Sequence, residues 1–288
     1  MATRRRRAAW WIARIAALIA AAYAAFELSP WPSALVYRTA MDWDGESLNA
    51  VPTIVWIHGG AFLSGDKGQI ANYLTILGAR GYTSVGVNYS LGPGARYPTP
   101  VRLAKAALGY LVRESYRLRI DPQRLYLAGD SAGAHIAAQL ANSISVPAYA
   151  KALGISRSIS RAQLRGVILH CGVYDLALAR FDGAFGHFMR TAIWSYGGRT
   201  SPAHMPEFSV TRYVSADFPP AFITAGNGDP LLAHSHALAE ALVKVGAKVD
   251  TLFFAADYQP QLLHEYPFNL DTDAGRLALE RTLSFLTQ

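Results

Sequence analysis

The sequence predicts an α/β fold in which a mainly parallel β-sheet is flanked by helices. Short runs rich in β-branched and aromatic residues alternate along the chain with longer helical patterns. Several of these runs are apolar at nearly every position, which is typical of strands buried on both faces of a sheet. With 288 residues, 51% of them hydrophobic and 16% charged, the chain can bury a large core. We therefore expect one main globular domain with a short N-terminal appendage.

The appendage carries the marks of a membrane-directed segment. Arginines at positions 4–7 precede an apolar stretch over residues 8–26, which Arg14 interrupts. The stretch is close to the length of about 17–25 residues that a membrane-spanning helix needs, so residues 1–28 are predicted to be a signal anchor. A removable signal peptide is an open alternative, because Ala22-Tyr23-Ala24 fits a small-x-small cleavage site. The third alternative is an amphipathic or disordered basic tail.

The charge distribution bears on partners and location. The net charge is +7, but five of the 27 basic residues lie in the tail, and from residue 29 onward 22 basic residues face 19 acidic ones. This near balance argues against a nucleic-acid partner. Because arginines mark the cytoplasmic side, we expect the main domain on the non-cytoplasmic side, either membrane-anchored or exported to the periplasm. The single cysteine, Cys171, sits in an apolar run and is predicted to be a core residue.

The elements follow in a regular order. Residues 29–50 form a linker and N-terminal strand region, and residues 51–288 form the main domain. The predicted strands cover residues 53–57, 82–88, 124–128, 166–171, 221–225 and 248–254. The predicted helices cover residues 69–80, 100–118, 132–143, 231–245 and 271–286. Residues 174–219 interrupt the alternation with an aromatic and glycine-rich stretch, for which a lid over a substrate pocket and an ordinary surface helix pair both remain open.

A Gly-x-Ser-x-Gly motif joins the third strand to the helix after it. The motif runs from Gly129 to Gly133 and places Ser131 at the turn. A tight strand-to-helix turn needs flanking glycines and projects the serine hydroxyl above the sheet. The helix N-terminus below it offers N–H groups and positive potential to a developing oxyanion. Ser131 is therefore the predicted nucleophile.

The sequence His58-Gly59-Gly60-Ala61-Phe62 directly follows the first predicted strand. A glycine-rich turn in this place can aim N–H groups at the oxygen of a bound carbonyl. The predicted oxyanion hole therefore comprises Gly59, Gly60, Ala61 and, from the elbow, Ala132. His58 is expected to stabilise the loop rather than to transfer protons.

The order of the chain selects the base and the acid. In folds with this elbow the acid and the histidine follow the serine, and only His264 comes after the last predicted strand, in a polar loop. Asp229 follows the strand 221–225 directly, where it can orient an imidazole. Its alternative role as a helix N-cap before Pro230 is compatible with catalysis. Asp217 precedes that strand and Asp257 is close to the histidine in the same loop, so neither is preferred.

These motifs together resemble the hormone-sensitive-lipase-like branch of the α/β-hydrolases. The resemblance rests on HGGAF at 58–62, GDSAG at 129–133, Asp229-Pro230-Leu231 and His264, and it spans residues 51–288. Gly65-Asp66-Lys67, the segment from Gly81 and the SAGAH run at 131–135 are also similar to neighbouring esterases and formamidase-like enzymes. The resemblance implies an α/β-hydrolase fold with an inserted lid and hydrolysis of carboxylic esters of short or medium acyl chains.

The expected function is that of a serine hydrolase whose substrate is a small-molecule ester and which requires no cofactor. Amidase, formamidase or deacetylase action with the same triad is an alternative, because this machinery also cleaves amides. A non-catalytic binding domain on a hydrolase fold is the alternative of another class. No metal motif competes, since the sequence has no cysteine pair and no His-Glu-x-x-His.

Overall fold

The computed structural model describes Arg14, residues 50–198 and residues 205–287. The described residues from Ala50 onward belong to one compact unit. The predicted signal segment at 1–28, apart from Arg14, and nearly all of the predicted region 29–50 lie outside the described residues. Among the described residues, no helix combines the length and the apolar character that crossing a membrane requires.

The centre of the main unit is a six-stranded sheet with the order β2-β1-β3-β4-β5-β6, in which every pairing is parallel. The strands are β1 Val51–Ile57, β2 Thr83–Val87, β3 Ile120–Asp130, β4 Leu164–His170, β5 Ala221–Ala225 and β6 Val249–Phe253. All six predicted strands are present. β3 begins earlier than predicted because Ile120 pairs with Val51 across a shift in register.

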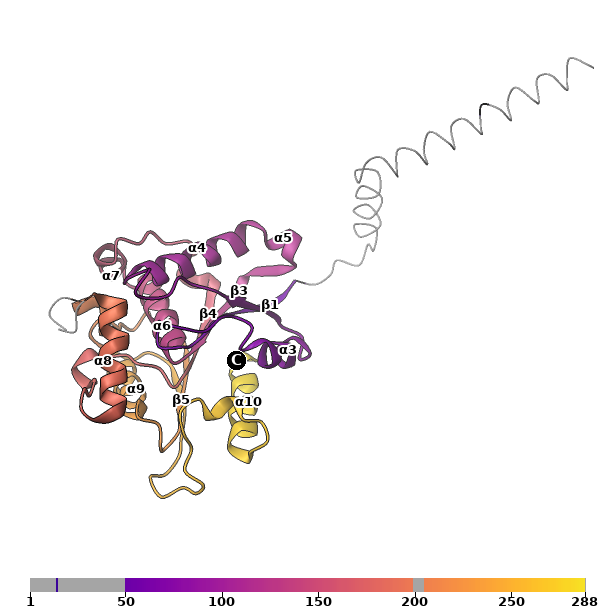
Figure 1. The fold of residues 1–288 in the computed structure, drawn as a ribbon. Helices are drawn as coiled ribbons and strands as arrows, with labels where there is room; N and C mark the ends of the chain where they lie inside the picture. The colour runs from indigo at the N-terminus through magenta and orange to yellow at the C-terminus, as the bar shows by residue number, and fades with distance from the viewer. Residues whose placement is uncertain (1–13, 15–49, 199–204, 288) are drawn as a thin grey trace, which may run out of the picture. The chain divides into compact units, whose positions relative to one another are not determined.

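Helices cover both faces of the sheet (Figure 1). Side chains of β1 alternate between the two faces, with Ile54 and Trp56 in one buried cluster and Val55 and Ile57 in the other. The first cluster is completed by two helices, α3 Ala71–Gly78 and α10 Asp273–Leu286. The second is completed by α4 Thr99–Arg113, α6 Ala132–Ser145 and α9 Leu232–Lys244. The alternation therefore builds two apolar layers, as a sheet covered on both faces requires.

Three regions differ from the helices that the sequence predicts. The helix predicted over 100–118 is divided into α4 and α5 Ser115–Leu118, because Glu114 leaves helical geometry at φ −96° and ψ 16°. A short helix, α7 Pro147–Ala152, was not predicted. Among the described residues of the region 174–219 there is one α-helix, α8 Gly183–Gly197, rather than a helix pair, with 3-10 turns at Leu176–Leu178, Pro206–Phe208 and Val210–Arg212. The other described 3-10 turns are Arg161–Gln163 and Tyr266–Phe268.

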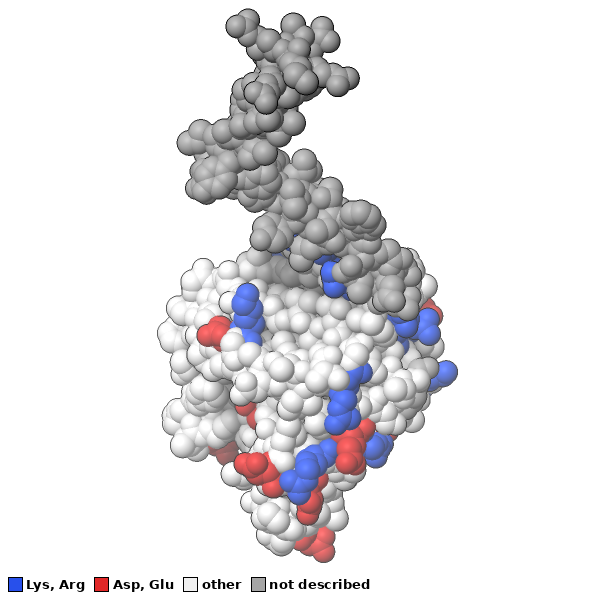
Figure 2. Space-filling view, turned by 90° about the vertical axis from the view of Figure 1, so that its right-hand side faces the viewer, with Lys and Arg blue, Asp and Glu red and all other residues white. Residues whose placement is uncertain are grey.

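The charged side chains of the main unit are mixed on the surface. Figure 2 shows basic and acidic side chains interspersed over the face that it presents, with wide uncharged areas between them. Some of these charges pair directly, as in the Arg281–Asp250 ion pair of 2.5 Å between α10 and β6. This arrangement fits the near balance of charge that the sequence has outside the tail.

Candidate active site

The turn between β3 and α6 holds Ser131 in a strained conformation. Ser131 has φ 49° and ψ −117°, a combination that costs a non-glycine residue about 1–3 kcal/mol. A Cβ on Gly129 would overlap the backbone of Gly133, and a Cβ on Gly133 would overlap the carbonyl group of Ile57. Neither position can therefore carry a side chain, which explains why both motif glycines are needed for this elbow.

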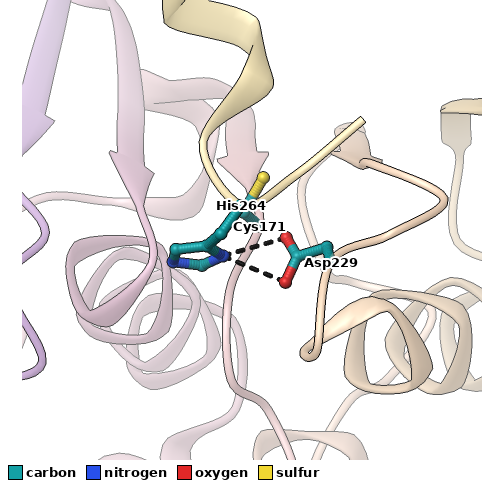
Figure 3. Close-up of side chains that lie close together, drawn as sticks. All are labelled: Cys171, Asp229 and His264. Atoms are coloured by element: carbon teal, nitrogen blue, oxygen red, sulfur yellow. Dashed lines mark hydrogen bonds and ion pairs between the residues drawn. The ribbon is translucent and has the colours of Figure 1, made fainter. Parts of the chain in front are cut away.

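The structure brings Ser131, His264 and Asp229 together in one hydrogen-bonded chain. His264 Nε2 lies 3.0 Å from Ser131 Oγ. On the other side of the ring, His264 Nδ1 lies 2.9 Å and 3.0 Å from the two carboxylate oxygens of Asp229 (Figure 3). Asp229 Oδ1 also accepts a 2.8 Å hydrogen bond from the N–H of Leu231, which fixes the carboxylate at the start of α9. The three residues thus lie within hydrogen-bond reach in the order that proton transfer requires.

The surroundings of His264 stabilise the protonated form of its imidazole. The Asp229 side chain is 0% exposed and that of His264 is 32% exposed. Burial lowers the pKa of His264, but the hydrogen bond to Asp229 and the charge of that carboxylate outweigh burial, so the pKa lies above 6.5. The buried carboxylate therefore stabilises the positive charge that the ring gains when it accepts a proton.

The other described histidines have surroundings that suit structural roles. His58 Nδ1 lies 2.7 Å from the carbonyl of Gly59, and its ring stacks on Tyr89. His135 and His170 are fully buried, and burial lowers the pKa of each to about 3, which keeps them neutral. His234 Nδ1 accepts hydrogen bonds of 3.4 Å and 3.3 Å from the N–H groups of Tyr174 and Asp175. His187 lies on α8 and His236 packs on Phe253, while His204 is outside the described residues.

The loop after β1 makes a tight, strained turn over the nucleophile. Gly60, Ala61 and Phe62 have φ of 105°, 53° and 65°, all in the left-handed region. The N–H groups of Leu63 and Ser64 both donate to the Gly60 carbonyl at 3.0 Å and close the turn. The cost of two non-glycine residues in this region indicates that the surrounding contacts hold the turn in place.

The structure separates Gly59 from the other predicted oxyanion donors. Gly60, Ala61 and Ala132 line the same pocket as Ser131, whereas Gly59 does not. The backbone of Gly59 is hydrogen-bonded to the carboxyl group of Asp130 and so is engaged away from the pocket. Gly60, Ala61 and Ala132 therefore have positions beside Ser131 that suit an oxyanion hole, and the role predicted for Gly59 stays a prediction.

An aromatic contact that the sequence did not reveal anchors this turn. The Phe62 ring stacks on Tyr196 of α8 with a centroid distance of 3.9 Å and an interplanar angle of 6°. The edges of His135 and Phe208 enclose the same ring at 5.6 Å and 6.1 Å. Since Phe62 is only 2% exposed, α8 and its neighbours determine where the turn lies.

A mainly apolar pocket of about 200 Å³ opens beside Ser131. Its walls come from the strained turn, the elbow, Val173, Leu231 and, on α8, from Phe185, Phe188, Met189 and Ala192. The region 174–219 therefore supplies a pocket wall, which favours the first of its two expected roles. A larger cavity of about 450 Å³ lies at the amino ends of β4 and β6, among residues such as Arg161 and Lys248. The smaller pocket is the candidate site, because ligands of open parallel sheets bind at the carboxyl ends of the strands.

Figure 3 shows Cys171 close to His264 and Asp229. Its Sγ and the nearest ligand atoms of Asp229 and His264 all lie within 4.8 Å of one another, a spacing that could hold a metal ion. Burial raises the pKa of the Cys171 thiol well above its usual value, so the group stays protonated. A protonated thiol beside an already hydrogen-bonded Asp–His pair suits a catalytic chain better than a metal centre.

Comparison with known proteins identifies the family. The family model described as BD-FAE matches residues 44–242 of the chain. The chain belongs to the BD-FAE family. The acetyl esterase of Salmonella choleraesuis (strain SC-B67) is 28% identical over 204 residues, which cover 66% of this chain but only 59% of the relative.

Solved esterase structures share the fold of this BD-FAE member. Esterase B from Lactobacillus rhamnosis (HN001) superposes with a TM-score of 0.72 at 24% identity, covering 83% of this chain and 76% of that one. The hyperthermophilic esterase from Pyrobaculum calidifontis superposes with a TM-score of 0.68 at 21% identity, covering 83% and 75%. The predicted α/β-hydrolase fold and the resemblance to esterases are thereby confirmed.

Proposed function

We propose that the chain is a serine carboxylesterase that hydrolyses short- to medium-chain carboxylic esters through an acyl-enzyme on Ser131. The hydrogen-bonded chain of Ser131, His264 and Asp229 at an apolar pocket is the observation that carries this proposal. The esterase names of its relative and its structural neighbours support ester hydrolysis.

The geometry supports a two-step reaction. Ser131 Oγ attacks the acyl carbon while His264 Nε2 takes the hydroxyl proton, and Asp229 stabilises the resulting imidazolium. The N–H groups of Gly60, Ala61 and Ala132 are the candidate donors to the oxyanion, aided by the positive end of α6. The imidazolium then protonates the leaving alcohol. Water attacks the acyl-enzyme while His264 accepts its proton. The bond between the acyl carbon and Ser131 Oγ then breaks, His264 returns the proton to Oγ, and the product acid leaves.

The pocket favours small acyl groups. Its volume of about 200 Å³ is below the roughly 300–1,000 Å³ of pockets that hold drug-sized ligands. Its walls are mostly apolar, so they suit an alkyl chain. One relative is an acetyl esterase, and Esterase B has a structure inhibited by a tributyrin phosphonate. We therefore expect the best turnover with acetate to butyrate esters.

A chain-length series tests the proposal. The full chain would be assayed with p-nitrophenyl esters from acetate to laurate, with Ser131→Ala as the control. We expect hydrolysis by the wild type that peaks at short acyl chains and is lost in Ser131→Ala. Turnover of aryl formamides without ester turnover would instead favour the amidase or formamidase alternative. The absence of both, together with failure to react with a fluorophosphonate, would favour a non-catalytic binding domain.

We further propose that residues 1–28 direct the domain across a membrane. The support is the order of four arginines followed by an apolar stretch. The mass of the native N-terminus and the fractionation of membranes from soluble extract would test this. An uncleaved chain in the soluble fraction of the cytoplasm would contradict it.

A further inference from the structure

Two acidic side chains lie beside the hydrogen-bonded Ser131, His264 and Asp229 without being part of that set. Asp130 directly precedes Ser131, and Glu265 directly follows His264. Asp130 is 3% exposed, and its Oδ1 accepts a 2.7 Å hydrogen bond from Trp56 Nε1. Glu265 has a left-handed backbone with φ 62°, and its side chain is 41% exposed at the pocket. The pair therefore joins the elbow to the histidine loop.

The carboxyl groups of Asp130 and Glu265 lie near each other at Gly59. A Cβ built on Gly59 would meet an oxygen of each. Burial raises the pKa of Asp130 to about 7. The hydrogen bond from Trp56 lowers this pKa and the nearby charge of Glu265 raises it. Below about pH 7 Asp130 is therefore protonated beside Glu265.

The pair lies on the reactive side of the imidazole. Glu265 Oε1 is 3.9 Å from His264 Nε2, the nitrogen that lies 3.0 Å from Ser131 Oγ. Asp229 contacts the opposite nitrogen, so the ring lies between acidic groups on both sides. The charges of Glu265 and Asp130 both raise the pKa of His264.

The other titratable groups that face this cluster are neutral. Burial raises the pKa of the Cys171 thiol, which faces Asp229 and Glu265, well above its usual value. Burial likewise raises the pKa of Tyr89, which faces Asp130. The charge beside His264 Nε2 is therefore set by Asp130 and Glu265 together.

We propose that Glu265 is a positioning residue for the proposed esterase: its carboxylate places a negative charge 3.9 Å from His264 Nε2. The inference rests on the proposed function. This charge stabilises the imidazolium that forms when Ser131 gives its proton to His264. The proton on Asp130 keeps a second negative charge away from the site where the oxyanion develops.

The test is the pH profile of kcat/KM for p-nitrophenyl butyrate. Activity on the acidic side requires neutral His264, so the midpoint of that limb follows the pKa of His264. We expect Glu265→Gln to move the midpoint to lower pH, because it removes the negative charge that lies 3.9 Å from His264 Nε2. Asp130→Asn leaves the charge on Glu265 and should not lower it. The double variant should lower it by at least about half a pH unit, the effect of one charge at this distance in a water-like dielectric.

Controls separate this inference from a structural role and from the proposed function. Glu240→Gln removes one exposed charge on α9 and should leave the midpoint unchanged. The rate of Ser131 labelling by a fluorophosphonate gives a second pH profile that needs no ester turnover. A wild type that is labelled but cleaves no ester would overturn the proposed function, and the labelling profiles would still test Glu265. An unmoved or raised midpoint in Glu265→Gln and in the double variant would overturn the inference, whatever the change in Tm.

Discussion

Phe62 offers the sharpest test of how the fold positions the oxyanion turn. Phe62→Leu removes the stack on Tyr196, worth about 0.5–1.5 kcal/mol beyond burial, and leaves space in the aromatic cluster. That loss is comparable with the strain of about 1–3 kcal/mol stored at each of Ala61 and Phe62. The turn should therefore relax, and its N–H groups should no longer point at the oxyanion. Since one oxyanion donor is worth about 10²–10³ in kcat, we expect kcat to fall by about 10²-fold with little change in KM.

The assay compares Phe62→Leu with Phe208→Leu as a matched control. Phe208 is 0% exposed in the same cluster, but it belongs to the Pro206–Phe208 turn and not to the strained loop. Urea unfolding should show a similar loss of stability in both variants, whereas the large fall in kcat should be confined to Phe62→Leu. Equal losses of kcat in the two variants, or wild-type kcat in Phe62→Leu, would refute the reasoning.

Three further predictions concern other parts of the site. Asp229→Asn should leave the protein folded and lower kcat by about 10³–10⁴-fold, because the imidazole loses the partner that fixes its tautomer; circular dichroism and kinetics check this. The pKa of Asp130 is about 7 in the folded state and 3.8 in the unfolded reference, so its stabilising effect is complete at low pH and is lost as pH rises through 7. Wild-type Tm should thus fall between about pH 4 and pH 7, and Asp130→Asn should flatten that fall, whereas parallel curves would contradict the assignment. Ala192→Leu fills part of the pocket and should lower the ratio of octanoate to acetate turnover, and an unchanged ratio would place the acyl chain elsewhere.

Local sequence signals were sufficient to predict the sheet and the hydrogen-bonded residues Ser131, Asp229 and His264. Several strands are short, nearly continuous apolar runs, and the glycines at 129 and 133 mark a turn that tolerates no side chain. His264 and Asp229 follow from strand order, because parallel strands place the loops after them at one edge of the sheet. Ser131, Asp229 and His264 meet there although they are far apart in sequence.

Features that depend on tertiary contacts were not predictable in the same way. Asp130 is the variable position of the elbow motif and Glu265 a polar loop residue, and only the folded chain brings their carboxyl groups together. The hydrogen bond between the Gly59 backbone and Asp130 was not predictable for the same reason, since Asp130 comes from another strand. The aromatic anchor at Phe62 was not predicted, because its partner Tyr196 lies on α8, in the region 174–219 whose role the sequence left open.

The most direct test of the account is the site at which the protein reacts with a fluorophosphonate. Intact-mass measurement and peptide mapping of the full chain should give one adduct per molecule, located on Ser131. The adduct should be absent in Ser131→Ala and strongly slowed in His264→Ala, because the hydroxyl then lacks its base. An adduct on another residue, or a folded wild type that does not react, would contradict the assignment of Ser131 as the nucleophile.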